Sequence, residues 1–190
     1  GKSYKKLWDD RAMPQKPNYD LAFFRAVGIY SDQLYPSTTN TQLVTECRDQ
    51  SFYSLGDLAE RSHTPDPVGT VLMISEQFDD DEQHIEGSCL LAPPEDFECC
   101  WQFTSVYGNI SIWRPIPPPN YVACGFVAMA SLQKPSKQSI RMVHRSIAER
   151  GKLFPEALWK YKDVSFWMNC GSSPNNPLPG TFIFSPSLTL

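Results

Sequence analysis

Residues 109–114 read Asn-Ile-Ser-Ile-Trp-Arg, and two other stretches of the chain repeat this pattern. Residues 20–25 read Asp-Leu-Ala-Phe-Phe-Arg, and residues 163–168 read Asp-Val-Ser-Phe-Trp-Met. Each stretch runs polar, aliphatic, small, large apolar and aromatic. Short runs rich in β-branched and aromatic residues favour strands over helices. The three stretches therefore indicate an internal repeat built on β-strands.

A tryptophan precedes each stretch in a similar local setting. The three are Trp8, Trp101 and Trp159. They come 16, 12 and 8 residues before the aromatic position of the following stretch. Strands of constant length joined by turns of variable length account for these differences. We therefore expect each tryptophan to occupy the same place in its own repeat.

Further blocks continue the repeat at a constant offset. Residues 52–59 align with residues 121–128, and residues 71–74 align with residues 140–143, both at an offset of 69. The extra length of the first copy is rich in Ser, Thr and Asn around residues 36–50, which predicts a surface insertion. The second pairing also favours a strand over the helix-like pattern that begins at Ser139.

Recurring glycines mark one position of the third block. Gly56 and Gly125 align, and Gly180 is the candidate in the third copy. Glycine at such a position predicts a bulge or a close approach of two backbones.

The repeat predicts an all-β fold in a single domain over residues 1–190. Its units span about residues 4–75, 97–145 and 155–190. One small antiparallel sheet per unit has an apolar face and is not stable alone in water. Three such sheets that bury each other's apolar faces form a β-prism with pseudo-threefold symmetry. Seventeen prolines among 190 residues agree with short strands rather than long helices.

Strand alternation leaves two interpretations of Trp113. It sets Ile110 and Ile112 on one face and Ser111 and Trp113 on the other. Trp113 is then either a tryptophan of the sheet packing, which is the favoured reading, or an exposed aromatic contact platform.

Residues 113–125 read Trp-Arg-Pro-Ile-Pro-Pro-Pro-Asn-Tyr-Val-Ala-Cys-Gly and resemble the W-R-P…P-P-x-G-Y-x-x-L-G-D signature of the vacuolar protein sorting 62 family. Residues 55–57, Leu-Gly-Asp, carry its last part in the first copy. Departures are Asn120 for glycine, Cys124 for leucine and Phe126 for aspartate. Related repeats occur in vacuolar-protein-sorting lipid-transfer proteins. The resemblance implies a non-catalytic module of membrane traffic that contacts lipid head groups or adaptor peptides.

Charge is distributed unevenly along the chain. Residues 76–98 carry nine acids and no Lys or Arg, whereas residues 134–162 carry eight bases against two acids. A basic edge of this kind can dock on anionic lipid or a protein partner, or it can pair with the acidic segment. The residues expected to make the contact are Lys134, Lys137, Arg141, Arg145, Arg150 and Lys152, followed by Trp113 and Arg114.

Motifs for catalysis or cofactors are not found in the sequence. There is no H-E-x-x-H, G-x-S-x-G or C-x-x-C. The acidic run at residues 79–82 lacks the spacing of a calcium loop and is interpreted as a solvated loop. The six cysteines lie mostly beside apolar residues, which predicts buried free thiols in a reducing compartment. The alternative is a secreted protein with some disulfides. We expect no enzyme, no cofactor and no metal.

The resulting expectation is a binding module that is cytoplasmic and peripheral to membranes, with secretion as the alternative. A net charge of −4 argues against nucleic acid, and no apolar run is long enough to span a membrane. The alternative is a lectin-like prism that binds carbohydrate through Asn109, Asp57 or Asn175 and Asn176. A cysteine hydrolase is the third class considered.

Overall fold

The computed structural model describes residues 4–13, 19–26, 53–64, 73–75, 89–169 and 181–188. Within these ranges the chain forms strands β1 to β14 and two short 3-10 helices, and no α-helix. The part of the chain that the structure describes is therefore all-β, as the strand-like sequence blocks predict. The insertion at residues 36–50, the acidic run at 79–82, Asn175, Asn176 and Gly180 lie outside the described residues.

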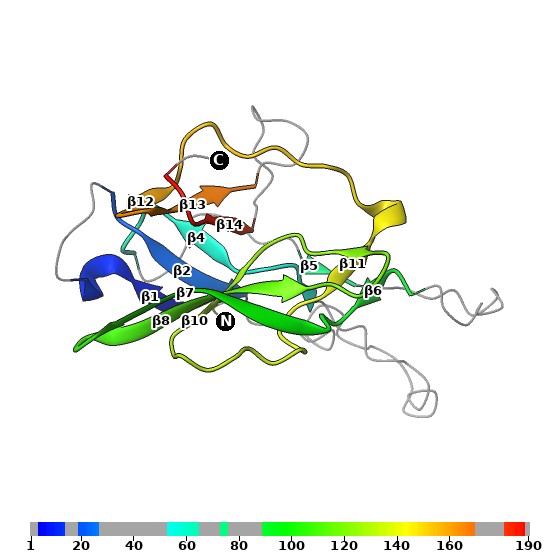
Figure 1. Ribbon diagram of the computed structural model, residues 1–190, viewed down its shortest axis with the longest axis horizontal. Coiled ribbons are helices and arrows are strands. Elements are labelled where there is room, and N and C mark those ends of the chain that lie inside the picture. The colour runs from blue at the N-terminus through cyan, green and yellow to red at the C-terminus, as the bar shows by residue number, and fades with distance from the viewer. Residues whose placement is uncertain are drawn as a thin grey trace, which may run out of the picture.

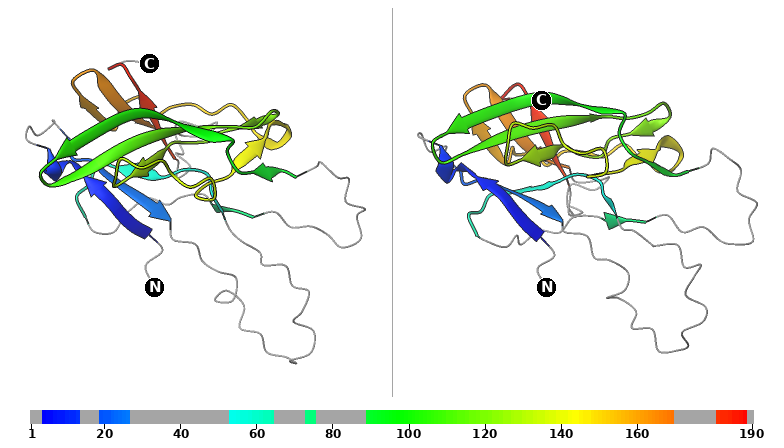
Figure 2. Two further views of the ribbon diagram at one scale, coloured as in Figure 1. Left: turned by 60° about the horizontal axis from the view of Figure 1, so that its bottom comes forward. Right: turned by 90° about the horizontal axis from the view of Figure 1, so that it is seen from below.

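Three sheets of three strands share one strand order, in which the middle strand pairs antiparallel with both others. Seen from three directions, they stand around a common interior (Figures 1 and 2). They are β1 (Tyr4–Asp9), β2 (Ala22–Ala26) and β4 (Leu58–Glu60); β7 (Asp96–Ser105), β8 (Gly108–Ile116) and β10 (Val127–Met129); and β12 (Trp159–Tyr161), β13 (Val164–Met168) and β14 (Phe182–Ser185).

Two smaller sheets reproduce the predicted offset. Residues Tyr53–Ser54 (β3) pair with Met73–Ile74 (β5), and Tyr121–Val122 (β9) pair with Met142–His144 (β11). Tyr53 lies opposite Ile74, and 69 residues later Val122 lies opposite Val143. A further strand, β6 (Leu91–Ala92), pairs with the other edge of β11.

Strand register places the three tryptophans at corresponding positions. Trp8 lies opposite Phe23, Trp101 opposite Ile112, and Trp159 opposite Phe166, so each faces the same position of its block. The register shifts just before Trp8 and before Trp101, which indicates a β-bulge in β1 and in β7. The bulges turn these strands so that the tryptophans pack inward.

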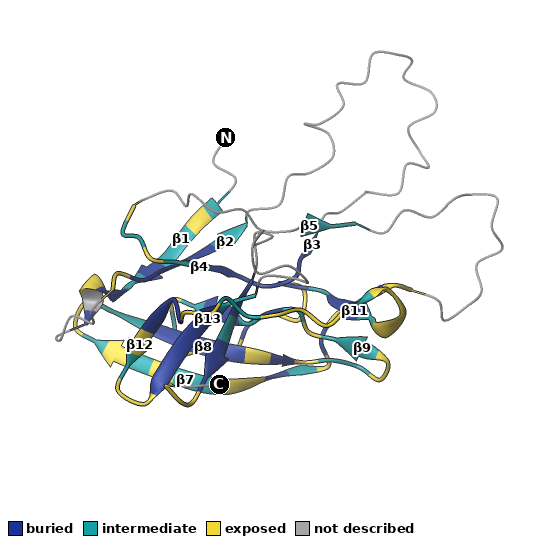
Figure 3. Ribbon diagram, turned by 90° about the horizontal axis from the view of Figure 1, so that it is seen from above, coloured by how far each residue is buried: buried dark blue, intermediate teal, exposed yellow. Residues whose placement is uncertain are grey.

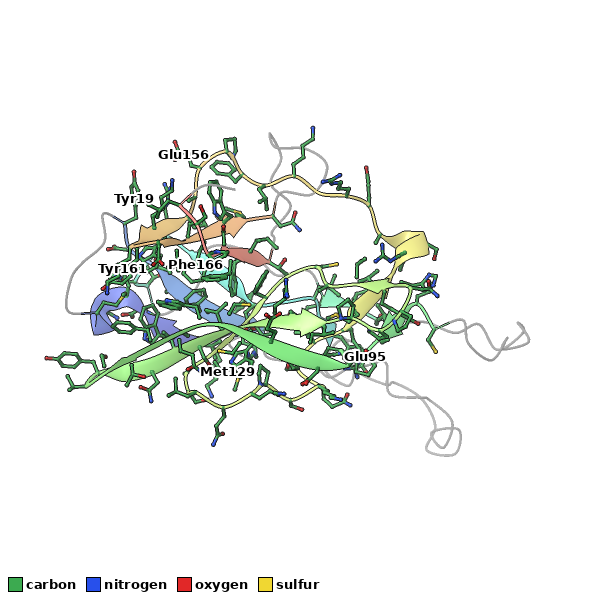
Figure 4. All side chains as sticks on the ribbon, viewed as in Figure 1. Tyr19, Glu95, Met129, Glu156, Tyr161 and Phe166 are labelled. Carbon is green, nitrogen blue, oxygen red and sulfur yellow. The ribbon has the colours of Figure 1, made fainter. Side chains whose placement is uncertain are left out.

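Apolar side chains of the three sheets meet in one core. The ring centroids of Phe23 and Phe166 are 5.2 Å apart, and those of Phe23 and Phe182 are 4.9 Å apart. Phe166 points into the space between the sheets (Figure 4), and the strand segments that line this space are buried (Figure 3). Contacts between aromatic rings at these distances add to the burial of apolar area in stabilising the core.

A ring of three backbone hydrogen bonds joins the sheets at the interior. Asp57 N–H donates to Phe126 O at 3.0 Å, Phe126 N–H to Phe182 O at 3.2 Å, and Phe182 N–H to Asp57 O at 3.3 Å. Gly56, Gly125 and Thr181 each immediately precede one member of this ring. A Cβ on Gly56 would lie 3.1 Å from the Cα of Gly125, so the predicted close backbone approach is confirmed there.

Trp113 is buried on the outer face of its sheet. Phe97, Val127, Ile140 and Met142 cover it in a second apolar cluster. The packing interpretation is therefore correct and the exposed platform is wrong, because the segment after β10 folds back over this face.

The segment after Ser139 forms a strand followed by a short 3-10 helix. Strand β11 is followed by η3 (Arg145–Ile147), in which the His144 side chain accepts a hydrogen bond from Ser146 N at 3.3 Å. The other 3-10 helix, η1 (Asp10–Ala12), follows β1. The preference for a strand over a helix in this segment is confirmed.

Candidate functional site

Three cations after β11 are exposed and unpaired with any other described residue. Arg145 lies in η3, and Arg150 and Lys152 lie in the chain that follows it. We call these three residues the cationic patch. Ile147 lies between them in sequence and is 50% exposed. Exposed cations beside an exposed aliphatic side chain suit contact with a partner surface that is both anionic and apolar.

Leu90 extends the apolar part of this surface. The backbone N–H of His144 donates to Leu90 O at 2.8 Å, which holds residue 90 beside the start of η3. Leu90 is itself exposed. Strands β6 and β11 carry this surface at the end of the molecule opposite the tip of the β7–β8 hairpin (Figures 1 and 2).

Two predicted contact residues are engaged in contacts within the chain. Lys134 Nζ lies 2.8 Å from Asp96 Oδ1, and the hydrogen bond from Lys134 lowers the pKa of Asp96. The Arg141 guanidinium lies 3.9 Å from the ring centroid of Tyr53 and donates to Gln138 Oε1 at 2.8 Å. Lys134 and Arg141 therefore differ from the cationic patch in having partners within the chain, whereas Lys137 is exposed without an ion pair to a described residue.

Arg114 borders a shallow groove of about 340 Å³. Residues 114–117, Gly125 and Phe126 line one part of it, and Ile183 of β14 lines another. The Arg114 guanidinium pairs with Glu98 at the exposed rim. Much of the motif that resembles the vacuolar protein sorting 62 signature therefore lines this groove. Trp113, the other predicted contact residue of that motif, is buried away from it.

The tip of the β7–β8 hairpin carries an apolar pair that the sequence analysis did not select. Val106 is 93% exposed and Tyr107 is 79% exposed. The sequence signal was two apolar residues between Ser105 and Gly108, where a polar turn is usual.

One predicted sugar-binding residue, Asp57, is closed off from solvent. Asp57 is fully buried and bound by Arg25, so it cannot reach a carbohydrate. Asn109 lies in β8 and is half-buried. Carbohydrate binding through Asp57 is therefore wrong, because the carboxylate belongs to an internal ion pair.

The described cysteines are not buried, contrary to the prediction. Cys89 and Cys99 are exposed, and Cys100 and Cys124 are half-buried; all four are free. Desolvation raises the pKa of Cys99, Cys100 and Cys124, and thiols with a raised pKa are poor nucleophiles at neutral pH. Cys100 and Cys124 pack against the margins of apolar clusters, which cover them only in part.

Other chemistry in the described residues is limited. Asp10, Asp20 and His63 bring three possible metal ligands together. No helix among the described residues is long and apolar enough to cross a membrane.

The fold resembles that of a solved bacterial protein. The crystal structure of GNIP1Aa from Chromobacterium piscinae matches with a TM-score of 0.63 and 20% sequence identity. The match covers 98% of this chain and 32% of GNIP1Aa, so the chain spans about a third of the length of that protein. At this identity the likeness shows the fold alone. No curated protein matches the chain.

The sequence match is more specific. The model of the family described as vacuolar protein sorting-associated protein 62 matches residues 36–171, which is more than half of the chain. The chain therefore belongs to the vacuolar protein sorting-associated protein 62 family, and the resemblance at residues 113–125 is confirmed.

Proposed function

We propose that the chain is a non-catalytic β-prism module that docks on anionic membrane surfaces, as part of a larger protein in vacuolar sorting. The observation that carries the proposal is the cationic patch. Its three side chains are exposed and form no ion pair with another described residue, and they flank the exposed Ile147.

The prism part of the proposal draws support from the equivalence of the three sheets. The same strand order recurs in all three, and each tryptophan faces the same position of its block. A closed ring of hydrogen bonds through Asp57, Phe126 and Phe182 is what a pseudo-threefold axis requires. A rigid prism would hold the patch in a fixed orientation relative to the membrane.

The free energy of docking would be the sum of several small contributions. Each Lys or Arg near an anionic surface contributes about 1 kcal/mol, and this attraction falls off within a Debye length. Three patch cations together supply about 3 kcal/mol, which is weak alone. Insertion of Ile147 and Leu90 into the interfacial region would add apolar burial. The docking is therefore reversible and depends on salt.

The family and the fold support the proposed location of the chain in the cell. The family is named for vacuolar protein sorting, and the exposed cations of the cationic patch suit a membrane-associated role within it. The match to about a third of GNIP1Aa supports a fold that occurs within longer chains. We place the chain in the cytoplasm, peripheral to membranes.

Vesicle co-sedimentation tests the proposal. The chain is mixed with phosphatidylcholine vesicles, with or without phosphatidylserine, at low and high salt. We expect recovery only with phosphatidylserine and less of it at high salt. Arg145→Gln, Arg150→Gln and Lys152→Gln together should weaken binding on the order of a hundredfold, which corresponds to about 3 kcal/mol.

The matched control removes the same charge elsewhere. Lys5, Lys160 and Lys162 are exposed cations on or beside β1 and β12. Their replacement by glutamine should leave most vesicle binding intact if the patch makes the contact. Equal loss in both triple variants would point to net charge alone, and equal recovery by all vesicles would refute the proposal.

A further inference from the structure

The strands β1, β2 and β4 of the first sheet bring Asp10, Asp20 and His63 together at one end of that sheet. Asp10 directly follows β1, Asp20 lies two residues before β2, and His63 lies three residues after β4. Because neighbouring strands are antiparallel, the end of β1, the start of β2 and the end of β4 coincide. Tyr19, the neighbour of Asp20, marks this end of the molecule in Figure 4.

The three side chains form a compact group centred on the imidazole. His63 Nε2 contacts Asp10 Oδ1, and His63 Nδ1 lies 3.5 Å from Asp20 Oδ2. One possible ligand atom from each residue lies within 4.8 Å of the others.

Asp10 is a buried carboxylate with no Lys or Arg of the described residues at ion-pair distance, although Arg11 lies next to it in the sequence. Asp10 is 4% exposed, and its second oxygen accepts a hydrogen bond from Trp159 Nε1 at 3.2 Å. Asp57, the other buried aspartate of the described residues, is neutralised by the Arg25 guanidinium. Among the described residues, the only ion-pair partner of Asp10 is His63, which is charged only when protonated. A positive charge or a metal ion stabilises an ionised carboxylate that is buried in this way.

We propose that Asp10, Asp20 and His63 bind a divalent transition-metal ion, with zinc as the best fit. One imidazole nitrogen with two carboxylates suits zinc, whereas calcium and magnesium prefer ligands that are all oxygen. Trp159 supplies the outer hydrogen bond that fixes a ligating carboxylate. Solvent completes the coordination, since the Asp20 side chain is 63% exposed.

Binding requires a small rearrangement that the exposed side permits. Zinc bonds of about 2.0–2.2 Å place tetrahedral ligand atoms roughly 3.4 Å apart. The ion therefore replaces the hydrogen bond between His63 Nε2 and Asp10, and it binds this nitrogen only in its deprotonated form. Rotation of the exposed Asp20 side chain closes the third bond. The metal then clamps the ends of β1, β2 and β4 together.

Zinc titration of the chelator-treated full chain tests the site. Calorimetry should show one saturable zinc site, and zinc should raise the unfolding temperature by several degrees. Asp20→Asn should weaken zinc affinity at least about tenfold without changing the unfolding temperature in chelator, because Asp20 is exposed. His63→Ala should abolish binding, with some loss of stability because Asp10 is left unpaired.

Two controls separate this site from other binding. Calcium and magnesium should give no shift in the unfolding temperature. Free cysteines also bind zinc, so cobalt is substituted: nitrogen and oxygen ligands give visible bands without the near-ultraviolet thiolate charge-transfer band. The absence of saturable zinc binding, a thiolate band, or equal affinity in Asp20→Asn and the native chain would each overturn the proposal.

Discussion

Arg25 binds the fully buried carboxylate of Asp57 through two parallel hydrogen bonds. Arg25 Nε lies 2.9 Å from Asp57 Oδ1, and Arg25 Nη2 lies 2.8 Å from Asp57 Oδ2. Arg25 Nη2 also donates to Ala128 O at 2.8 Å, and Ala128 N–H donates to Asp57 Oδ2 at 2.8 Å. The pair therefore ties β2 to β10, which belong to different sheets. Burial raises the pKa of Asp57, and the hydrogen bonds from Arg25 oppose that shift.

Removal of one partner of this pair should strongly destabilise the fold. Arg25→Met leaves a buried carboxylate without its cation, so we expect a loss of about 3–5 kcal/mol in urea unfolding. The double variant Arg25→Met, Asp57→Asn should be more stable than Arg25→Met alone, because no buried charge is left. Arg114→Met is the control: Arg114 holds the aligned position but pairs with Glu98 in solvent, so its loss should cost below about 1 kcal/mol. Similar losses in both single variants would contradict this account.

Two of the three aligned stretches contain the same serine–tryptophan hydrogen bond. Trp113 Nε1 donates to Ser111 Oγ, and Trp167 Nε1 donates to Ser165 Oγ, both at 2.7 Å. Each serine in turn donates to a carbonyl of a later segment, at residue 131 or 187. In the first copy the aligned residues 22 and 24 are alanine and phenylalanine, and neither can form this bond.

The serine and the tryptophan should therefore be energetically coupled. Ser111→Ala leaves a buried indole N–H without an acceptor, which costs about 1–3 kcal/mol. In a Trp113→Phe background the same change should cost about 1 kcal/mol less, because phenylalanine has no donor to leave unpaired. Urea unfolding of the four variants measures the coupling, and the cycle at Ser165 and Trp167 is an independent repeat. If the effects of the serine and tryptophan changes are additive in both cycles, the hydrogen bond does not couple the two side chains.

Local pattern was sufficient to predict the strands. The offset of 69 residues aligned the segments of β3 and β5 with those of β9 and β11, and in the structure both pairs of strands take the same register. Alternation also put Trp113 on the outer face of its strand, but it could not show that residues 131–142 cover that face. The third aligned position after Gly56 and Gly125 was placed at Gly180, whereas Thr181 precedes Phe182 in the ring of hydrogen bonds.

Features that depend on distant segments could not be predicted. A charge count over residues 134–162 treated every cation alike, yet Lys134 meets Asp96, which is 38 residues away. Asp10 and His63 are 53 residues apart in the sequence. They meet only because the ends of β1 and β4 lie at the same end of one sheet. Sequence distance carries no information on such contacts until the strand order is known.

Gly125 should tolerate no side chain. An ideal Cβ at this position would lie 2.2 Å from Thr181 Cβ and 2.5 Å from its hydroxyl oxygen. We expect Gly125→Ala to cost about 1–3 kcal/mol in urea unfolding, or more, because the backbones on both sides are fixed by hydrogen bonds. Thr181→Gly should recover part of this loss in the double variant. Gly108→Ala is the contrasting case, since it has open space but a φ of +143°, so any loss there should not respond to residue 181.

Asp9 should make stability depend on pH in acid. Burial alone would raise the pKa of Asp9, but hydrogen bonds from Arg11 and Lys6 outweigh it and hold the pKa well below its usual value. A carboxylate with a depressed pKa stabilises the fold at a pH above its pKa in the unfolded chain, about 3.9, and this contribution is lost as the pH falls further.

The variant Asp9→Asn tests this contribution, because it keeps the hydrogen-bond acceptor that caps η1 but removes the charge. Urea unfolding should therefore show a loss of about 1 kcal/mol at pH 6 that shrinks as the pH falls from about 4 to about 2. High salt should reduce the loss at pH 6, since the pairs are partly open to solvent. A loss that stays constant from pH 6 to pH 2 would mean that Asp9 acts through packing rather than charge.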